Sequence, residues 1–392
     1  MKALYEAKAM RASVTLSKRM HSSVSITTEE IVVCLSLIAI SISPIISPTA
    51  VVMNVVRAAF GFSCLLLYFA HYGARRETGI LATLACAFSV LSIVSSFYNG
   101  NESPLSFVWV WTYMGIGCLA ASCSRNSTPF AVTSALVTIV YLAAMLMGAD
   151  PNTLMVVGSR NNISVVLLLI LCLYYLVAVS NQNRDVSVAP SILCFVACVM
   201  AEGRAGVLVS LFIVVVTVLR KLLRSKRNVV KSVILILVLI AVAGVVVYLF
   251  WGSIQLVLDR FKDDGFTEDG RQSLLSEYFA GLGSSVGNLL FGVPFEEYHW
   301  LSHFENPHNS FVLLHSRFGL IAFLFVVGAL IRSCCIFFRQ RKFFLLLITL
   351  ALAVRSITDS ICFSGIVDVF WWAFVLKAQV EYRLDKASDV TA

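Results

Sequence analysis

Long runs of apolar residues alternate with short polar stretches along most of the chain. One run, VILILVLIAVAGVVVYLF, is long enough to cross a bilayer as a helix and lacks the alternation of a barrel strand. Backbone groups in lipid must bond to one another, so we expect these runs to be helices. The pattern predicts twelve apolar segments, at 31–49, 50–72, 79–98, 104–122, 129–148, 163–181, 187–201, 205–219, 233–252, 308–331, 343–358 and 362–381.

The composition supports the same interpretation. Hydrophobic residues make up 59% of the 392 residues and charged residues 13%, whereas soluble domains carry about a quarter charged residues. We therefore expect an all-α polytopic membrane protein with about twelve transmembrane helices. Its predicted parts are an N-terminal tail at 1–30, helices one to nine at 31–252, a long loop at 253–307, helices ten to twelve at 308–381 and a C-terminal tail at 382–392.

Basic residues are distributed unevenly between the two sides of the predicted helices. With the N-terminus in the cytoplasm, 22 of the 30 lysines and arginines fall in inner loops and tails, as the positive-inside rule requires. Both termini are therefore predicted to be cytoplasmic, and the long loop lies on the outer side. The net charge of +8 follows from this bias and does not indicate a nucleic-acid partner.

The remaining basic residues fall on the outer side or in the outer halves of the spans. A charge near the hydrocarbon costs about 3 kcal/mol or more. One interpretation is that each arginine pairs with a nearby carboxylate, such as Asp263, Glu202 or Asp359. For the set as a whole we favour an anionic ligand, because guanidinium groups bind phosphate oxygens in pairs and a lipid-linked diphosphate is a suitable bilayer ligand. The set is Arg57, Arg160, Arg204, Arg260, Lys262, Arg271, Arg317 and Arg355.

Four of the six histidines lie between residues 299 and 315, where the long loop meets the tenth predicted helix. His308 is a candidate general base, because an imidazole titrates near neutrality and can accept a proton from a hydroxyl. Asn309 can hydrogen-bond to it or to a sugar, and Ser310 is suited to capping the helix. His315, seven residues on, is expected on the same helix face as His308. The alternative is that these histidines cap or pack the helix.

Other kinds of chemistry have little support. His299, His303 and His308 have no HExxH or comparable spacing, so we expect no metal site. The chain has no nucleotide-binding glycine motif and no CxxC, and its eleven cysteines fall in or beside apolar runs, as packing residues do. Within the long loop, RQSLLSEYFAGL predicts a helix along the membrane surface, and the rest is predicted as turn and loop.

The stretch PHNSFVLLHSRFGLIAFLFVVGALI resembles the O-antigen polymerase and O-antigen ligase superfamily. In that family a long periplasmic loop ends in H-N-x-x-L-x-x-x-x-x-x-G before an apolar helix. His308, Asn309 and Gly319 match the pattern, and Val312 occupies its leucine position. GSRNNISVVLLLILCLYYL, AEGRAGVLVSLFIVVV and DGRQSLLSEYFAGLGSSVGNLLFGVP resemble further family segments, so the resemblance covers roughly 155–335.

The resemblance implies a metal-independent glycosyltransferase of the bacterial inner membrane, with no cofactor and its active face in the periplasm. The donor would be an undecaprenyl-diphosphate-linked oligosaccharide, and a chain-length regulator protein is an implied partner. His308 would be the base, with Glu202 as second choice, and Arg204 and Arg271 would act on the leaving diphosphate. Residues expected to bind substrate are Arg160, Asn309, Arg317, Arg57, Arg260, His315 and Arg355.

Several functions stay open. Polymerisation of repeat units into O-antigen or a related surface polysaccharide is favoured. A ligase would use the same donor and transfer the glycan to the lipid A core. A transporter of lipid-linked sugars is an alternative of another class, although the chain shows no duplicated halves and its outer basic residues gather at one face. A membrane component without chemistry is a third alternative.

Overall fold

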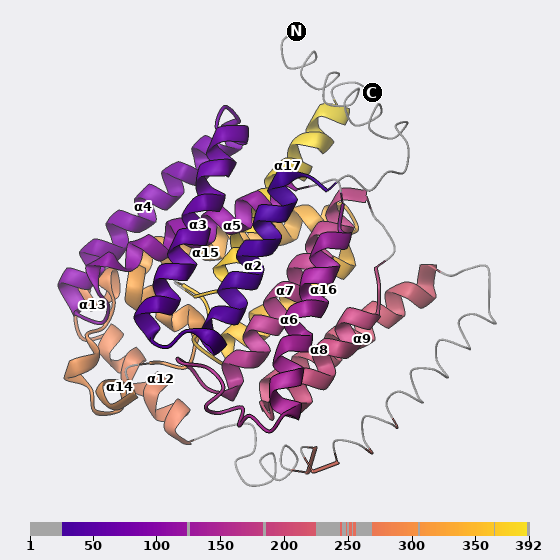
Figure 1. Cartoon of the computed structure of the whole chain (residues 1–392). Helices are drawn as coiled ribbons and strands as arrows, with labels where there is room; N and C mark the ends of the chain where they lie inside the picture. The colour runs from indigo at the N-terminus through magenta and orange to yellow at the C-terminus, as the bar shows by residue number, and fades with distance from the viewer. Residues whose placement is uncertain are drawn as a thin grey trace.

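The computed structural model describes residues 26–123, 126–182, 186–224, 269–304, 306–363 and 365–389, with isolated positions between 244 and 255. Every regular element in these ranges is a helix, which confirms the predicted all-α class for this part of the chain (Figure 1). The predicted span at 233–252 lies almost wholly outside the described residues.

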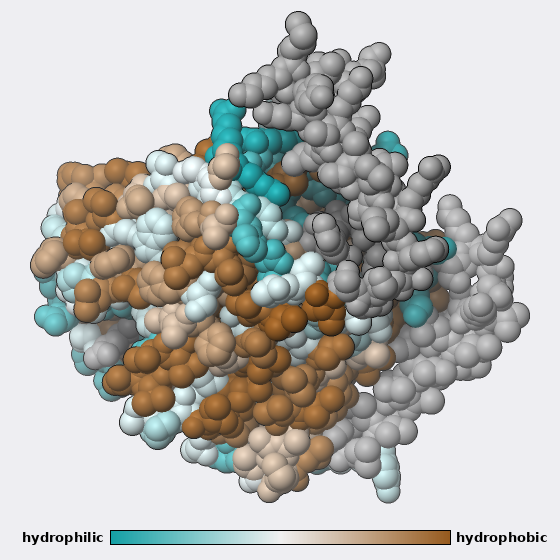
Figure 2. All heavy atoms as spheres, turned by 45° about the horizontal axis from the view of Figure 1, so that its top comes forward, coloured by the Kyte–Doolittle hydropathy of each residue, from teal (hydrophilic) through white to brown (hydrophobic). Residues whose placement is uncertain are grey.

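The bundle helices follow the predicted apolar segments closely. Their bounds are α2 (Thr28–Ile46), α3 (Ala50–Tyr72), α4 (Arg76–Asn99), α5 (Phe107–Ser122), α6 (Thr128–Leu146), α7 (Arg160–Gln182), α8 (Ala189–Met200), α9 (Arg204–Arg224), α15 (Ser310–Arg339), α16 (Phe343–Ile357) and α17 (Asp368–Asp389). In the described part, 8 helices are long and apolar enough to cross a membrane, and α8 and α16 are shorter apolar helices. The chain is thus a polytopic membrane protein. Brown, apolar side chains cover much of its side in Figure 2.

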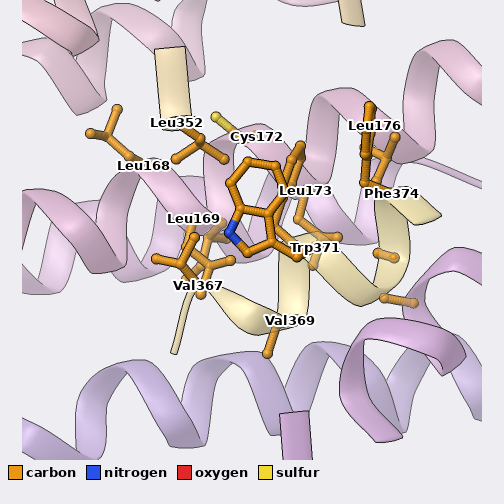
Figure 3. Close-up of a cluster of buried hydrophobic side chains, with 14 of the residues drawn as sticks. Leu168, Leu169, Cys172, Leu173, Leu176, Leu352, Val367, Val369, Trp371 and Phe374 are labelled. Atoms are coloured by element: carbon orange, nitrogen blue, oxygen red, sulfur yellow. The ribbon is translucent and has the colours of Figure 1, made fainter. Parts of the chain in front are cut away.

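The core of the bundle forms around α7. In this helix 94% of the most apolar window is buried, against 22–61% in the other spanning helices. Leu169 and Leu173 lie beside Trp371 of α17, and Leu176 lies beside Phe374 of the same helix (Figure 3). Because α7 is the central helix, its first residues are held in the middle of one end of the bundle.

That end also carries the described part of the long loop, and we call it the loop end (Figure 1). The predicted helix in RQSLLSEYFAGL is present as α12 (Asp269–Leu282), but the following residues are more ordered than the predicted turn and loop. They form α13 (Val286–Phe291), a 3-10 turn η2 (Phe295–Glu297) and α14 (His299–Phe304). These short elements surround a core of their own, made of Leu274, Tyr278, Val293, Phe295, Leu301 and Val312. Burial of this core offsets the weak helix tendency of such short segments.

The α4–α5 connection fixes this unit to α15. Nδ2 of Asn99 donates to the carbonyls of Phe291 and Ser316, at 2.8 and 2.7 Å. Asn101 donates to the carbonyl of Val293 and accepts from the backbone N–H of Phe295, both at 2.8 Å. The small unit is therefore bound to the bundle by hydrogen bonds as well as by apolar packing.

The structure gives a physical reason for the starts of the tenth and the last helices, both of which lie later than predicted. The tenth helix begins at Ser310 rather than 308, because Oδ1 of Asn309 accepts hydrogen bonds from the N–H groups of Phe311 and Val312 and caps the helix there. The last helix begins at Asp368 rather than 362, because the Asp368 carboxylate accepts from the N–H groups of Phe363 and Gly365. A loop of about ten residues therefore separates α16 from α17.

Candidate functional site

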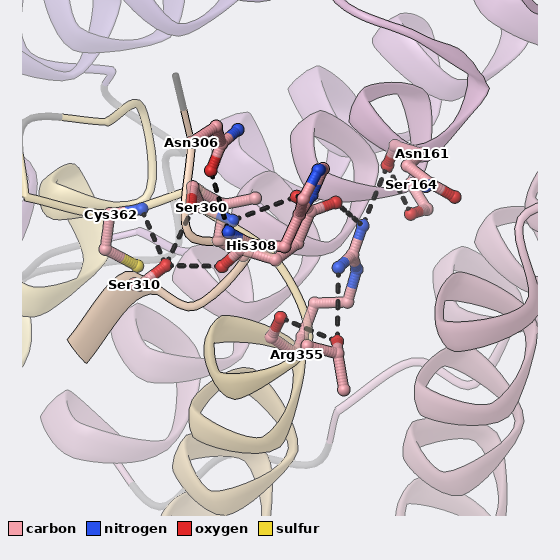
Figure 4. A network of polar contacts seen from close by, with 11 residues as sticks. Asn161, Ser164, Asn306, His308, Ser310, Arg355, Ser360 and Cys362 are labelled. Atoms are coloured by element: carbon pink, nitrogen blue, oxygen red, sulfur yellow. Dashed lines mark hydrogen bonds and ion pairs between the residues drawn. The ribbon is translucent and has the colours of Figure 1, made fainter. Parts of the chain in front are cut away.

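Ser310 joins the start of α15 to the α16–α17 loop. Its buried hydroxyl donates to the carbonyl of Asp359 at 2.7 Å and accepts from the N–H groups of Ile361 and Cys362, at 2.9 and 3.2 Å (Figure 4). The sequence suggested that Ser310 caps the helix. In the structure Asn309 is the cap, and Ser310 instead holds the α16–α17 loop against the start of α15. This contact fixes Asp359 beside His308, two residues before the helix begins.

His308 lies at this junction, just outside α15. Its φ of 48° is in the left-handed region, which is uncommon for a residue with a side chain. Oδ1 of Asn306 accepts from its N–H at 2.9 Å and supports this conformation. The His308 side chain is 32% exposed, so it is accessible from outside the protein. Since His308 is not helical, the predicted shared face with His315 does not exist.

Asp359 lies between His308 and Arg355. Its Oδ1 is 3.7 Å from Nδ1 of His308, and its Oδ2 accepts from Nη2 of Arg355 at 3.2 Å. Burial would raise the pKa of Asp359, but the contact with His308 and the positive charge of Arg355 outweigh burial and lower its pKa to about 2. Asp359 is therefore an anion at any physiological pH, and it orients Nδ1 of His308 toward itself.

Arg355 ties this pair to the centre of the bundle. It is 1% exposed, and its Nη2 also donates to the carbonyl of Asn161 in the first turn of α7, at 3.1 Å. Nη1 donates to the hydroxyl of Thr358 at 3.3 Å. The sequence predicted that Arg355 binds substrate. In the structure it is buried, and both of its terminal nitrogens donate to protein acceptors.

Arg160 and the turn before α9 lie beside Asn161, the residue whose carbonyl accepts from Arg355. Nη1 of Arg160 lies 3.8 Å from Oε2 of Glu202, and both side chains are partly exposed. Glu202 has a φ of 56°, also in the left-handed region. A Cβ at Gly203 would come 3.1 Å from Oδ1 of Asn161, so this turn packs closely on the start of α7. Arg204 begins α9 one residue later and is half-buried.

The structure thus brings six residues of four separate segments to one place at the loop end, and we call them the polar cluster. Backbone strain of the kind seen at His308 and Glu202 is concentrated at functional sites in proteins. The polar cluster consists of Asn161, Arg160, Glu202, His308, Arg355 and Asp359.

Three other predicted residues have different surroundings. His315 is buried, and its ring nitrogens contact the hydroxyl of Tyr278 at 2.6 Å and the carbonyl of Leu289 at 2.8 Å. It therefore fastens the loop-end unit to α15. Arg317 pairs with Glu102 and donates to the carbonyl of Phe363. Arg57 lies on α3 beside the buried Tyr113.

Some predictions fall outside what the structure describes. Arg260 and Lys262 lie outside the described residues, and for Arg271 only its place in the first turn of α12 is described. Within the described ranges, no three His, Cys, Asp or Glu side chains come together in a way that could hold a metal ion.

Asp359 is the residue whose role sequence reasoning missed. From the sequence, Asp359 was expected only as a partner for an arginine. It does pair with Arg355, four residues earlier, which is the spacing at which side chains on a helix meet. Its second contact, with His308, joins residues 51 positions apart along the chain. No local pattern predicts such a contact.

Fold and site together define a helical polytopic membrane protein with a histidine–carboxylate–arginine cluster at one end of its bundle. No family model matches the chain, and the comparisons with curated proteins and with solved structures found no match either.

Proposed function

We propose that this protein is a membrane glycosyltransferase that polymerises undecaprenyl-diphosphate-linked oligosaccharides into a surface polysaccharide. The loop end would face the periplasm of a bacterial inner membrane. The observation that carries the proposal is the convergence of a partly exposed imidazole, an ionised carboxylate and partly exposed arginines at one end of a membrane bundle. The resemblance of residues 155–335 to the O-antigen polymerase and ligase superfamily supplies the substrate class.

In the proposed reaction His308 is the general base. Nδ1 faces Asp359, which leaves Nε2 to accept the proton of the acceptor hydroxyl. The hydroxyl oxygen forms a bond to the anomeric carbon of the donor while the bond from that carbon to the diphosphate oxygen breaks. The electron pair leaves with the diphosphate. Asp359 stabilises the imidazolium that results, in the way that a buried carboxylate supports a catalytic histidine.

Arg160 and Arg204 are the proposed contacts of the leaving diphosphate. Both are half-exposed, whereas Arg355 is buried. Positive charge placed where negative charge develops is commonly the largest catalytic contribution. In this proposal Glu202 holds the Arg160 guanidinium in place before the donor binds.

The test is the banding of surface lipopolysaccharide on a gel, from a strain that lacks the gene and from the same strain carrying wild-type or variant copies. Loss of the polymerase leaves core bearing a single repeat unit. Loss of a ligase leaves bare core and polymer on the lipid carrier, and loss of a transporter leaves bare core with repeat units retained on the cytoplasmic side. An unchanged ladder overturns the proposal.

A variant pair tests the role of the site in the same assay. His308→Ala is expected to give the banding of the deletion strain, with an unchanged amount of protein in the membrane. His71→Ala is the matched control, because His71 pairs with Glu29 at the opposite end of the bundle and is expected to restore the ladder. A full ladder from His308→Ala would refute the base assignment.

A further inference from the structure

Helix α14 presents two large aromatic side chains to the outside. Leu301 is fully buried in the core of the loop-end unit, whereas Trp300 and Phe304 are 37% and 42% exposed. Four residues apart, they occupy one face of the helix. Their rings are nearly parallel, with 6.1 Å between centroids and 9° between planes. We call this pair the aromatic face.

The aromatic face lies next to the polar cluster. The ring of Phe304 lies 6.2 Å from the ring of His308, measured between centroids. The exposed imidazoles of His299 and His303 flank the pair, at 5.7 Å from Trp300 and 4.9 Å from Phe304. An extended ligand that lies on α14 would thus reach the proposed base.

A carboxylate of α12 holds the aromatic face in place. Oε2 of Glu277 accepts from the N–H groups of Trp300 and Leu301, at 2.8 and 3.1 Å. A negative charge at the first turn of a helix satisfies free N–H groups and stabilises the helix. The rings are therefore ordered before a ligand arrives, which reduces the entropy lost on binding.

We propose that Trp300 and Phe304 bind a sugar ring of the glycan on which His308 acts. This inference rests on the proposed function and adds to it the place where the glycan lies. The faces of a pyranose carry C–H groups, which pack favourably on the electron-rich face of an aromatic ring. Its hydroxyl groups point outward from the ring edge, where His299 and His303 can hydrogen-bond to them.

The charge of the segment favours a sugar over the other parts of the substrate. Residues 295–309 contain three glutamates and neither lysine nor arginine. A diphosphate or an anionic lipid headgroup would be repelled there. The imidazoles beside the rings and the carboxylate of Glu277 below them also disfavour burial of this face in hydrocarbon, where polar groups are expensive.

The binding test uses the purified full-length protein in detergent. The probe is the lipid-free polysaccharide that mild acid releases from the cells that make the protein, and calorimetry measures its dissociation constant. Trp300→Ala and Phe304→Ala are each expected to weaken binding about tenfold, the change expected from loss of roughly one aromatic packing contact. Phe279→Ala is the matched control, since Phe279 is 60% exposed on α12 and is expected to bind as wild type does. Wild-type affinity in both α14 variants would overturn the inference.

A second measurement tests whether the aromatic face contacts the membrane instead of a glycan. The wild-type protein and Trp300→Phe are placed in phosphatidylcholine vesicles with brominated acyl chains, which quench tryptophan fluorescence on contact. The wild type is expected to lose a smaller fraction of its fluorescence than Trp300→Phe, because an exposed Trp300 adds emission that the bilayer does not quench. A larger loss in the wild type would put Trp300 in the bilayer and refute the sugar-binding role.

The failure of this inference is distinguishable from failure of the proposed function. If His308→Ala abolishes the polymer while both α14 variants bind and polymerise normally, only the sugar-binding role of the aromatic face is refuted. If His308→Ala polymerises normally while both α14 variants lose binding, the sugar-binding role is supported and the base role of His308 is refuted.

Discussion

Nδ1 of His308 lies 3.7 Å from Oδ1 of Asp359, and the same carboxylate holds the buried Arg355 through its other oxygen. One anionic group therefore links an accessible imidazole to the centre of the bundle. This relationship makes Asp359 the residue on which the geometry of the site depends most directly.

The first prediction concerns Asp359→Asn. The amide keeps the shape but loses the charge that would stabilise the imidazolium of His308, so we expect polymer formation to fall by roughly 10²–10⁴-fold, because the base loses the support on which its catalysis depends. The measurement is polymer made by membranes with equal amounts of protein. Asp150→Asn is the control, because Asp150 lies in an exposed turn after α6 and its carboxylate accepts hydrogen bonds from Asn152, two residues further on. Equal activity of the two variants would remove Asp359 from the mechanism.

The second prediction is the pH dependence of stability. The pKa of Asp359 is lowered from 3.8 to about 2 in the folded protein. Its stabilising contribution, on the order of 2 kcal/mol, is therefore complete only above about pH 5 and is lost as the pH falls from there toward 2. Thermal unfolding of the solubilised protein should show a gap between wild type and Asp359→Asn that is present at about pH 5 and narrows as the pH falls toward 2. A gap that widens on acidification would contradict the assigned direction.

The third prediction concerns Arg355→Lys. Lysine keeps the charge but cannot serve the Asn161 carbonyl, the Asp359 carboxylate and the Thr358 hydroxyl with one planar group. Because Arg355 is 1% exposed, we expect a loss of about 2–4 kcal/mol in the free energy of unfolding. Arg76→Lys, on an exposed residue at the start of α4, should change it by less than about 0.5 kcal/mol. Denaturant titration of the solubilised proteins distinguishes the two.

The fourth prediction concerns the break in α15 at Gly319. Its φ of 75° and ψ of 179° are accessible to glycine alone, and a Cβ there would collide with the carbonyl of Leu290. Gly319→Ala is therefore expected to destabilise the protein by about 3 kcal/mol or more. Gly328→Ala in the same helix meets nothing within 4 Å and should be neutral or stabilising by up to about 1 kcal/mol. A similar unfolding midpoint for both variants would show that the break is not required.

The apolar pattern alone was enough to predict the bundle. Every described bundle helix overlaps a predicted segment, because in lipid only a helix satisfies all backbone groups of a long apolar run. Loop-end arginines and the histidine before the tenth helix were also recognisable, since charge is rare and expensive in such surroundings. The pattern did not predict α13 and α14, which are too short to show a periodicity and owe their stability to a shared core.

Only the tertiary structure decided which of the candidate residues meet. It placed Arg355 in a buried hydrogen-bond network, His315 against Tyr278, and Arg317 against Glu102. It also brought Asp359 to His308 through the hydroxyl of Ser310. Hydrophobic periodicity determines which segments enter the membrane, since each segment meets the lipid by itself. Contacts between segments far apart in the chain depend on how the helices pack, and a sequence read in short windows contains no such information.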